Sequence, residues 1–468
     1  MRLGLWRRHR PTALLALAGV ALAGLALADL AVVGVGASLQ RRMDGGPEVQ
    51  SQLPAPFPGM LDEHPRIQYA QRAPSDRIAA LNRALADTRR ALRHDARTGY
   101  LVPVLDALGV APESQLLVFS KTGVQRAHTS PANPRALFFN ESVAVGYIPG
   151  APALELAVHD REQGVVFYTL DQSPAATPSF TRQTSCLTCH VSASTLEVPG
   201  LIVRSHVVDR DGARLPREGV TAVNHTTPHP QRWGGWFVTG NVAAPPYQPM
   251  GHLGNLTAVP DPIAEPDRPT SGPAIVSNHV FVQWLDSNPQ ARGYLSPLSD
   301  LAALLVFDHQ AHAVNLITHL GWEARVAGDA GTGALPAALR ERVHELADYL
   351  LFVGEATPVV EVTPRPGFAE HLTARTPKDR RGRSLGELDL VTRLMRYPCS
   401  YMVYSEAFDG LPAPVKRAVY RRLWEILTGK VTGPRYAHLS GATRRAIRQI
   451  LRDTKADLDA TLRAAPRS

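Results

Sequence analysis

Cys186-Leu187-Thr188-Cys189-His190 brings two thiols and an imidazole together within five residues. The chain has three cysteines and 17 histidines among 468 residues, and random placement predicts roughly 0.0007 such motifs. The alternatives for the two thiols are a disulfide, a redox dithiol and half of a zinc site. A zinc ribbon needs a second pair of ligands, but Cys399 stands alone. A thioredoxin-type dithiol is expected beside a βαβ pattern, which the flanking sequence lacks.

The spacing of the motif is that of an attachment site for covalent haem. Two thiols separated by two residues can add to the two vinyl groups of one haem, and the adjacent imidazole can then bond the iron. The sequence therefore predicts one haem c, with Cys186 and Cys189 as covalent anchors and His190 as the proximal iron ligand. On these three residues the chain resembles the c-type cytochromes.

The residues around the motif extend this resemblance. Phe180-Thr181-Arg182-Gln183-Thr184-Ser185 before it and Val198-Pro199-Gly200-Leu201 after it look like the flanks of large bacterial proteins that carry a single haem c. The resemblance to c-type cytochromes covers about 30 residues. The chain is far longer than a small cytochrome c, and it lacks the second such motif that two-haem periplasmic peroxidases carry.

The N-terminus has the pattern of a targeting segment. Four arginines precede an apolar run over 12–37 that only Asp29 interrupts, and small residues suited to a signal peptidase end at Ala28 and at Ala37. The run is also long enough to span a bilayer. We therefore expect 1–37 to be a signal peptide or an N-terminal membrane anchor. The body would be periplasmic, or anchored to the inner membrane with a periplasmic domain, which is where haem c is attached.

Composition limits the range of partners. The net charge is 50 − 42 = +8, which is a mild excess for 468 residues, and it does not by itself predict nucleic-acid binding. The sequence instead predicts a redox partner protein or a small-molecule oxidant, with a possible membrane tether through the N-terminal segment. The low cysteine count indicates that disulfides do not hold this exported chain together.

The hydrophobic pattern predicts an α+β fold in which an antiparallel sheet precedes the haem-attachment loop and helices make up most of the C-terminal half. We expect a Pro-rich linker over 38–75, a helix and an antiparallel β region over 76–180, a loop-rich haem-binding region over 181–297 and a helical region over 298–468. Short β-type runs are expected at 116–119, 136–139, 143–147, 154–158 and 164–169. Helices are expected at 76–92, 301–326, 339–353, 385–395, 413–427 and 443–462.

A second axial ligand is needed if the iron is six-coordinate. The loop-rich region offers His206, His225, His229 and His252. The predicted helix over 301–326 places His309, His312 and His319 on one face at 100° per residue. We take His252, His309 and His312 as the candidate distal ligands, and Met395 and Met402 as weaker ones. The alternatives for the helical histidines are a second metal site, a polar helix face or hydrogen-bonded core residues.

Other side chains suit a haem pocket without being specific to one. Trp233 and Trp236 could form apolar walls, since such pockets are largely apolar and aromatic. Arg204 and Arg232 could pair with the haem propionates, because an arginine fork matches a carboxylate. The alternative for the two tryptophans is packing, and the alternative for the two arginines is a solvated charge. Cys399 is expected to be a small buried hydrophobe.

Two functions follow from these residues. The first is an exported c-type cytochrome that binds one covalent haem and acts in electron transfer, which requires a second protein ligand to the iron. The alternative is a haem c oxidoreductase, peroxidase-like or gas-binding, with an open distal iron site. The sequence leaves open whether the chain is an enzyme, and it identifies no catalytic residue.

Overall fold

The computed structural model describes eight segments of the chain, all within one compact unit over 57–468. The predicted targeting segment 1–37, most of the linker and His252 lie outside the described residues. None of the described helices combines the length and apolar character that crossing a membrane requires. The described segments are 63–209, 211–238, 241–243, 293–296, 298–328, 335–357, 361–363 and 367–458.

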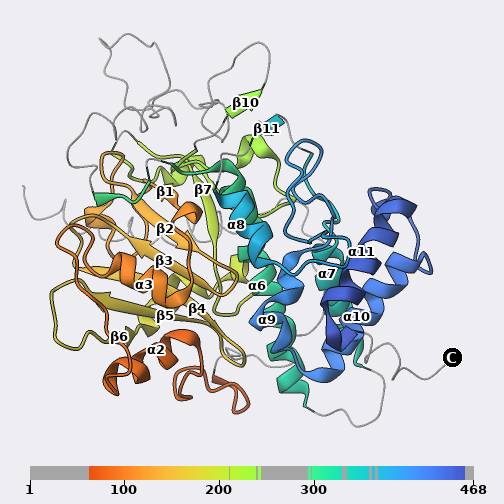
Figure 1. Cartoon of the computed structure of the whole chain (residues 1–468), viewed down its shortest axis with the longest axis horizontal. Helices are drawn as coiled ribbons and strands as arrows, with labels where there is room; N and C mark the ends of the chain where they lie inside the picture. The colour runs from red at the N-terminus through yellow and green to blue at the C-terminus, as the bar shows by residue number, and fades with distance from the viewer. Residues whose placement is uncertain are drawn as a thin grey trace, which may run out of the picture. The chain divides into compact units, whose positions relative to one another are not determined.

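An antiparallel sheet forms the N-terminal half of this unit (Figure 1). Its seven strands lie in the order β6-β5-β4-β3-β2-β1-β9. The five predicted β runs are confirmed as β1 to β5. Strands β6 and β9 were not predicted, because two or three residues are too few to show an alternating pattern. The strands are β1 (Leu116–Val118), β2 (Arg135–Phe139), β3 (Val143–Tyr147), β4 (Ala153–Asp160), β5 (Gly164–Asp171), β6 (Phe180–Arg182) and β9 (Trp236–Phe237).

Alternation along the strands gives the sheet two different apolar faces. One face, with Phe138 and Val166, packs under α2 (Arg77–Ala86) and α3 (Leu101–Leu108). The opposite face, with Phe139 and Phe167, packs against the long helix α6 (Leu301–Ala327). The sheet is therefore an internal layer, and a site on its second face has to lie beside α6.

Helix α6 (Leu301–Ala327) is the centre of the C-terminal half. The Asp300 carboxylate caps it by accepting hydrogen bonds from the backbone N–H groups of Ala302 and Ala303. Nearly all of its 27 residues are buried or half-buried, so the helix runs through the core rather than along the surface. The prediction of a helix over 301–326 is confirmed.

Helices α7, α8, α9 and α10 pack on α6 (Figure 1). Helix α10 also packs on α7 and α11. The predicted helix over 385–395 is wrong. That segment forms turns, because the Asp389 carboxylate accepts hydrogen bonds from the N–H groups of Val391 and Thr392, and Leu390 has a positive φ of 63°. The helices are α4 (Leu187–His190), α7 (Ala337–Leu350), α8 (Phe368–Arg375), α9 (Glu406–Asp409), α10 (Ala413–Thr428) and α11 (Gly441–Thr454).

Two small antiparallel pairs complete the β structure, and the expected α+β class is confirmed. The β7–β8 pair follows the cysteine motif in the sequence, and β7 packs against α6. The pairs are β7 (Val203–His206) with β8 (Val220–Val223), and β10 (Asn241–Ala243) with β11 (Glu361–Thr363).

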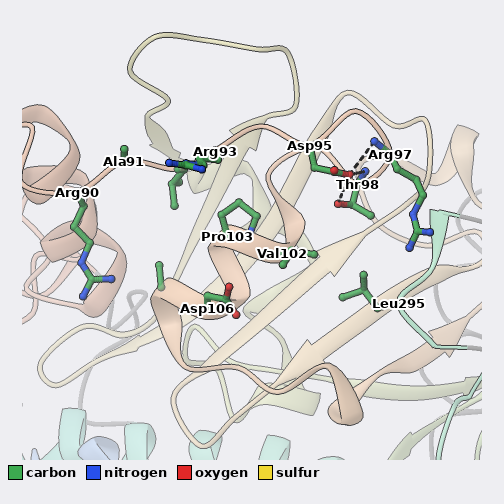
Figure 2. Close-up of a pocket in the computed structure, with 12 residues that line it drawn as sticks. Arg90, Ala91, Arg93, Asp95, Arg97, Thr98, Val102, Pro103, Asp106 and Leu295 are labelled. Carbon is green, nitrogen blue, oxygen red and sulfur yellow. Dashed lines mark hydrogen bonds between the residues drawn. The ribbon is translucent and has the colours of Figure 1, made fainter.

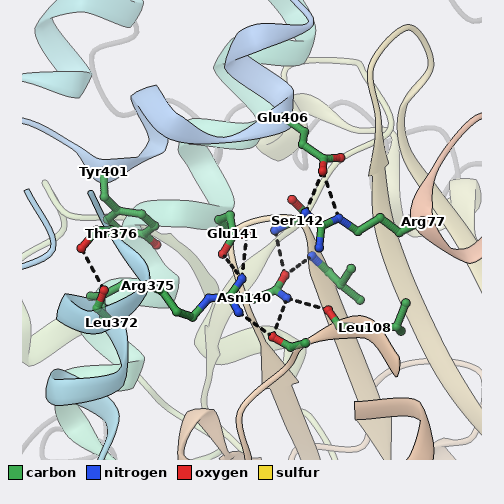
Figure 3. Close-up of polar contacts among 12 residues, drawn as sticks. Arg77, Leu108, Asn140, Glu141, Ser142, Leu372, Arg375, Thr376, Tyr401 and Glu406 are labelled. Atoms are coloured by element: carbon green, nitrogen blue, oxygen red, sulfur yellow. Dashed lines mark hydrogen bonds and ion pairs between the residues drawn. The ribbon is translucent and has the colours of Figure 1, made fainter. Parts of the chain in front are cut away.

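Polar contacts tie the sheet half to the helical half (Figure 3). Arg77 of α2 donates to Glu406 of α9 at 2.7 Å, and Arg375 of α8 donates to Glu141 of the β2–β3 turn at 3.0 Å. Each pair is partly exposed and contributes up to about 1 kcal/mol. Apolar packing against α6 is therefore the main force that joins the two halves.

Candidate haem-attachment site

The motif forms a single helical turn at one edge of the sheet. A 3-10 turn over Thr184–Cys186 runs directly into α4, which ends at His190. Cys186 and Cys189 are three residues apart in this turn and so lie on one side of it. Both are free thiols; Cys186 is half-buried and Cys189 is exposed. The two sulfur atoms are thus open to reaction with one flat group.

Strand β5 holds this turn in place through Gln183. The Gln183 backbone N–H donates to the Phe167 carbonyl at 2.8 Å, and its side-chain amide donates to the Thr169 hydroxyl at 2.8 Å. The Phe167 ring also contacts the His190 ring, with centroids 4.6 Å apart and planes at 51°. The motif therefore lies over the face of the sheet that packs against α6.

His190 has a defined tautomer. Its Nδ1 lies 2.8 Å from the Gly200 carbonyl oxygen, and because a carbonyl only accepts, Nδ1 carries the proton. Nε2 then has a free lone pair, which is the state in which an imidazole binds a metal. Burial lowers the pKa of His190, and the positive charges of Arg135 and Arg204 lower it further, so the ring is neutral.

Helix α6 positions the carbonyl that orients His190. Asn315 accepts a hydrogen bond from the Leu201 N–H at 2.9 Å and donates to the Leu201 carbonyl at 2.8 Å. Gly200 sits so close that a Cβ atom there would lie 2.2 Å from Asn315 Oδ1. A glycine is required at this position because the loop approaches the helix closely.

The thiol of Cys186 has a non-polar and negatively charged setting. Burial raises its pKa to about 11, with contributions from Glu155 and Cys189, so the thiol is protonated at neutral pH. Several apolar residues that pack on the same core cluster as Cys186 remain partly exposed: Leu137, Ala157, Leu187, Leu196 and Leu201. Two free thiols, a neutral imidazole with an available nitrogen and a partly uncovered apolar surface fit a covalently attached porphyrin.

Among the distal candidates, His309 is fully engaged by the protein. Its Nδ1 lies 2.7 Å from Nδ1 of His225, and its Nε2 lies 2.6 Å from the Ser400 hydroxyl. The ring stacks on Tyr349 with an interplanar angle of 3°. Burial lowers the pKa of His309 to about 3. Neither nitrogen is available to a metal in this arrangement.

His312 keeps its ring nitrogens free of hydrogen bonds within the described residues. It is half-buried and meets Tyr349 edge to face, with centroids 4.9 Å apart. His319, on the same helix face, pairs instead with Glu323 at 2.8 Å. No hydrogen bond or ring contact in the described segments joins His190 to His309 or His312. Nor do those segments hold any group of three or more His, Cys, Asp or Glu side chains arranged to bind a metal ion.

The predicted pocket arginines have different roles. Arg232 is buried and donates to Asp308 at 3.3 Å and to two backbone carbonyls, so it is a structural residue. Arg204, on β7, is half-buried and lies near enough to act on the pKa of His190. Trp233 and Trp236 are both buried. Their indole N–H groups donate to the Asp308 carboxylate and to the Arg204 carbonyl, respectively.

Cys399 is fully buried, as predicted, and burial raises its pKa to about 12. Met395 and Met402 are also fully buried in the same core. These three sulfur atoms therefore lie inside the helical half rather than on its surface.

A surface depression lies elsewhere, between the α2–α3 loop and the outer side of α3 (Figure 2). It has a volume of about 800 Å³, and its rim carries Arg90, Arg93 and Arg97. It is an open surface feature that includes neither cysteine of the motif nor any predicted distal ligand. We therefore assign it no part in the site.

Four residues of this site escaped the sequence-based prediction: Arg135, Glu155, Gly200 as a close-packing glycine, and Asn315. Glu155 offered one usable signal, since it is the only charged residue within the apolar run over 154–158.

Comparison with known proteins finds no matching family model, no similar curated protein and no similar solved structure.

Proposed function

We propose that the protein is an exported c-type cytochrome that binds one haem c and acts in electron transfer. Cys186 and Cys189 would hold the porphyrin through thioethers, and His190 would bind the iron through Nε2. The observation that carries this proposal is the hydrogen bond from His190 Nδ1 to the Gly200 carbonyl, which reserves Nε2 for a metal. When bound, the haem supplies a one-electron change at iron.

The protein residues around the motif would orient the ligand and limit the access of water. Asn315 holds the Gly200–Leu201 loop, and this loop holds the His190 ring. Phe167 supports the same ring from the sheet. A fixed proximal ligand and an apolar setting both change the reduction potential of haem iron.

We also propose that the protein works in the periplasm, either released or tethered to the inner membrane. The support is the basic and apolar pattern of 1–37 together with the motif itself, since haem c is attached outside the cytoplasm. The partner would be a redox protein, or a small-molecule oxidant if the iron has an open position.

A second candidate function is a haem c oxidoreductase with an open distal site, and the hydrogen bonding of His309 supports it. Both nitrogens of His309 are hydrogen-bonded inside the core, which leaves His312 and His252 as the predicted histidine ligands. An enzyme of this kind would be peroxidase-like or gas-binding.

An absorption spectrum of the exported protein, oxidised, reduced and then treated with carbon monoxide, tests the proposal. A low-spin spectrum that does not respond to carbon monoxide supports electron transfer with two protein ligands, and loss of that spectrum in His252→Ala or His312→Ala identifies the second one. A high-spin spectrum that shifts with carbon monoxide supports the oxidoreductase. Absence of covalent haem would overturn both.

A further inference from the structure

The strands beside the motif form a platform that reaches from Cys186 to Arg135. Gln183 is anchored on Thr169 of β5, which pairs with Glu155 of β4. Glu155 pairs with Gly146 of β3, and Gly146 pairs with Leu137 of β2. Directly paired residues share a face of the sheet, so this row faces the motif. Three strand spacings from β5 to β2 amount to about 14 Å, which is comparable with the span of a porphyrin and its propionates.

Two side chains meet over the middle of this platform. Arg135 Nη1 donates to Glu155 Oε2 at 3.2 Å, across the strand that carries Gly146. The contact is possible because Gly146 has no side chain to separate them. The Arg135 and Glu155 side chains are 16% and 21% exposed, which is well covered for an ion pair.

This ion pair has unmet hydrogen-bonding capacity. Arg135 Nε and Glu155 Oε1 are buried and have no hydrogen-bond partner among the described residues. Buried polar atoms in folded proteins almost always have partners, so an orphaned donor in a guanidinium indicates a missing acceptor. Arginine presents its donors in a planar fork that matches a carboxylate.

A second arginine lies near the same position. Arg204 of β7 is half-buried, and within the described residues its guanidinium makes no ion pair or hydrogen bond. Trp236 and Arg135 pair with the same residue of β1, so they share a face of the sheet. The Trp236 indole N–H donates to the Arg204 carbonyl at 2.9 Å, which places β7 beside this face. A haem anchored at Cys186 and Cys189 would bring two negative propionates close to these two positive charges.

We infer that Arg135 and Arg204 bind the propionates of the haem over the β2–β4 platform, and that Glu155 holds Arg135 in position. The inference rests on the proposed function. It gives the porphyrin an orientation that the motif alone does not determine, with the thioether side at β5 and the propionate side toward β2 and β7.

Redox titration of the haem-loaded full chain tests this inference. Removing a nearby positive charge disfavours the added electron, so Arg135→Gln and Arg204→Gln should each lower the midpoint potential. Removing the negative charge in Glu155→Gln should raise it. We expect about a tenfold change in the reduction equilibrium for each variant, which is about 59 mV for one electron. Arg381→Gln, an exposed arginine in the helical half, is the matched control.

A merely structural role for Arg135 would not reproduce the expected pH dependence. Propionate ionisation makes the potential fall as pH rises, and loss of an arginine partner should move that fall to higher pH. If Arg135→Gln does not fold, the inference is still tested by Arg204→Gln, which should lower the midpoint potential, and by Glu155→Gln, which should raise it. Shifts in midpoint potential no larger than that of Arg381→Gln would overturn the inference. If the intact mass of these variants still includes one haem, the proposed function stands. Absence of haem would overturn the proposed function itself.

Discussion

His190, beside α6, and His309, within α6, are both neutral histidines, but the protein surrounds them in opposite ways. His190 sits in a half-buried turn, and one of its nitrogens is held by a backbone carbonyl. His309 is fully buried, and both of its nitrogens are hydrogen-bonded to side chains. Phe167 supports the first ring, whereas Tyr349 and Phe352 enclose the second.

The difference shows that the supply of hydrogen-bond partners, rather than residue type, decides whether a histidine keeps a ring nitrogen available. In a core without water, each polar atom must find a protein partner. His225 and Ser400 provide them for His309, and this removes it from the set of available ligands. At the edge of the sheet, the described residues supply His190 with one hydrogen-bond partner, at Nδ1, so Nε2 remains available.

The largest expected effect is the loss of covalent haem from the motif region. In Cys186→Ala/Cys189→Ala neither thioether can form, and we expect no haem on the chain after denaturation. Intact mass and the absorbance of the denatured protein measure this directly. Cys399→Ala is the control and should keep its haem, because its thiol lies inside the helical core. Equal haem content in the double variant and the wild type would contradict the proposed site.

Replacing the core histidine should mainly reduce stability. His309→Ala leaves His225 and Ser400 buried without their partner and opens a cavity, so we expect a loss of about 3 kcal/mol in the free energy of unfolding. Urea unfolding measures it, with His319→Ala as a partly exposed control on the same helix. The haem spectrum of His309→Ala should match that of the wild type. Loss of a low-spin spectrum in this variant would show that His309 is a ligand after all.

A substitution in the loop between His190 and α6 should affect both the stability of the fold and the midpoint potential of the haem. Gly200→Ala brings a Cβ atom to 2.2 Å from Asn315 Oδ1, and we expect about 2 kcal/mol of destabilisation from the forced shift of the loop. The displaced carbonyl should also alter the midpoint potential through His190. Asn315→Ala, which removes the two hydrogen bonds without adding an atom, separates loss of the contacts from crowding. Urea unfolding and redox titration check both variants, and an unchanged potential in each would refute control of His190 by this loop.

The pH dependence of stability gives the smallest effect. Burial lowers the pKa of His309 to about 3, whereas an unfolded histidine titrates near pH 6.5. The unfolded state therefore binds a proton first, and stability that is complete above about pH 6.5 is lost as pH falls toward the folded pKa. His309→Gln should reduce the slope of the free energy of unfolding against pH by about 1.4 kcal/mol per pH unit. Urea unfolding between pH 6.5 and 5 measures it.

Two carboxyl groups act in the opposite direction. Burial raises the pKa of Asp308 and of Glu355 to about 7, so each of them favours folding most at low pH. Both groups are present in His309→Gln and in the wild type, so the difference between the two slopes isolates the histidine. Identical slopes would show that His309 is not the neutral buried base that its surroundings indicate.

Much of the fold was predictable because it depends on local pattern. The short apolar runs at 143–147 and 164–169 became strands, and the segment 301–326, predicted as a helix, became the central helix. The failed helix over 385–395 has a local cause as well, since an aspartate offered backbone N–H groups a partner outside a helix. In the candidate site, the motif residues were predicted from spacing alone, and their role in haem binding stays a prediction.

The sequence by itself determined that two thiols and an imidazole share one helical turn, because Cys186, Cys189 and His190 are neighbours along the chain. Only the tertiary structure decided which histidine keeps a free nitrogen and which charges surround it. Leu201 and Asn315 are 114 positions apart, and Arg135 meets Glu155 only because the sheet brings them together over Gly146. Such contacts depend on strand register and helix placement, and no local pattern encodes either of them.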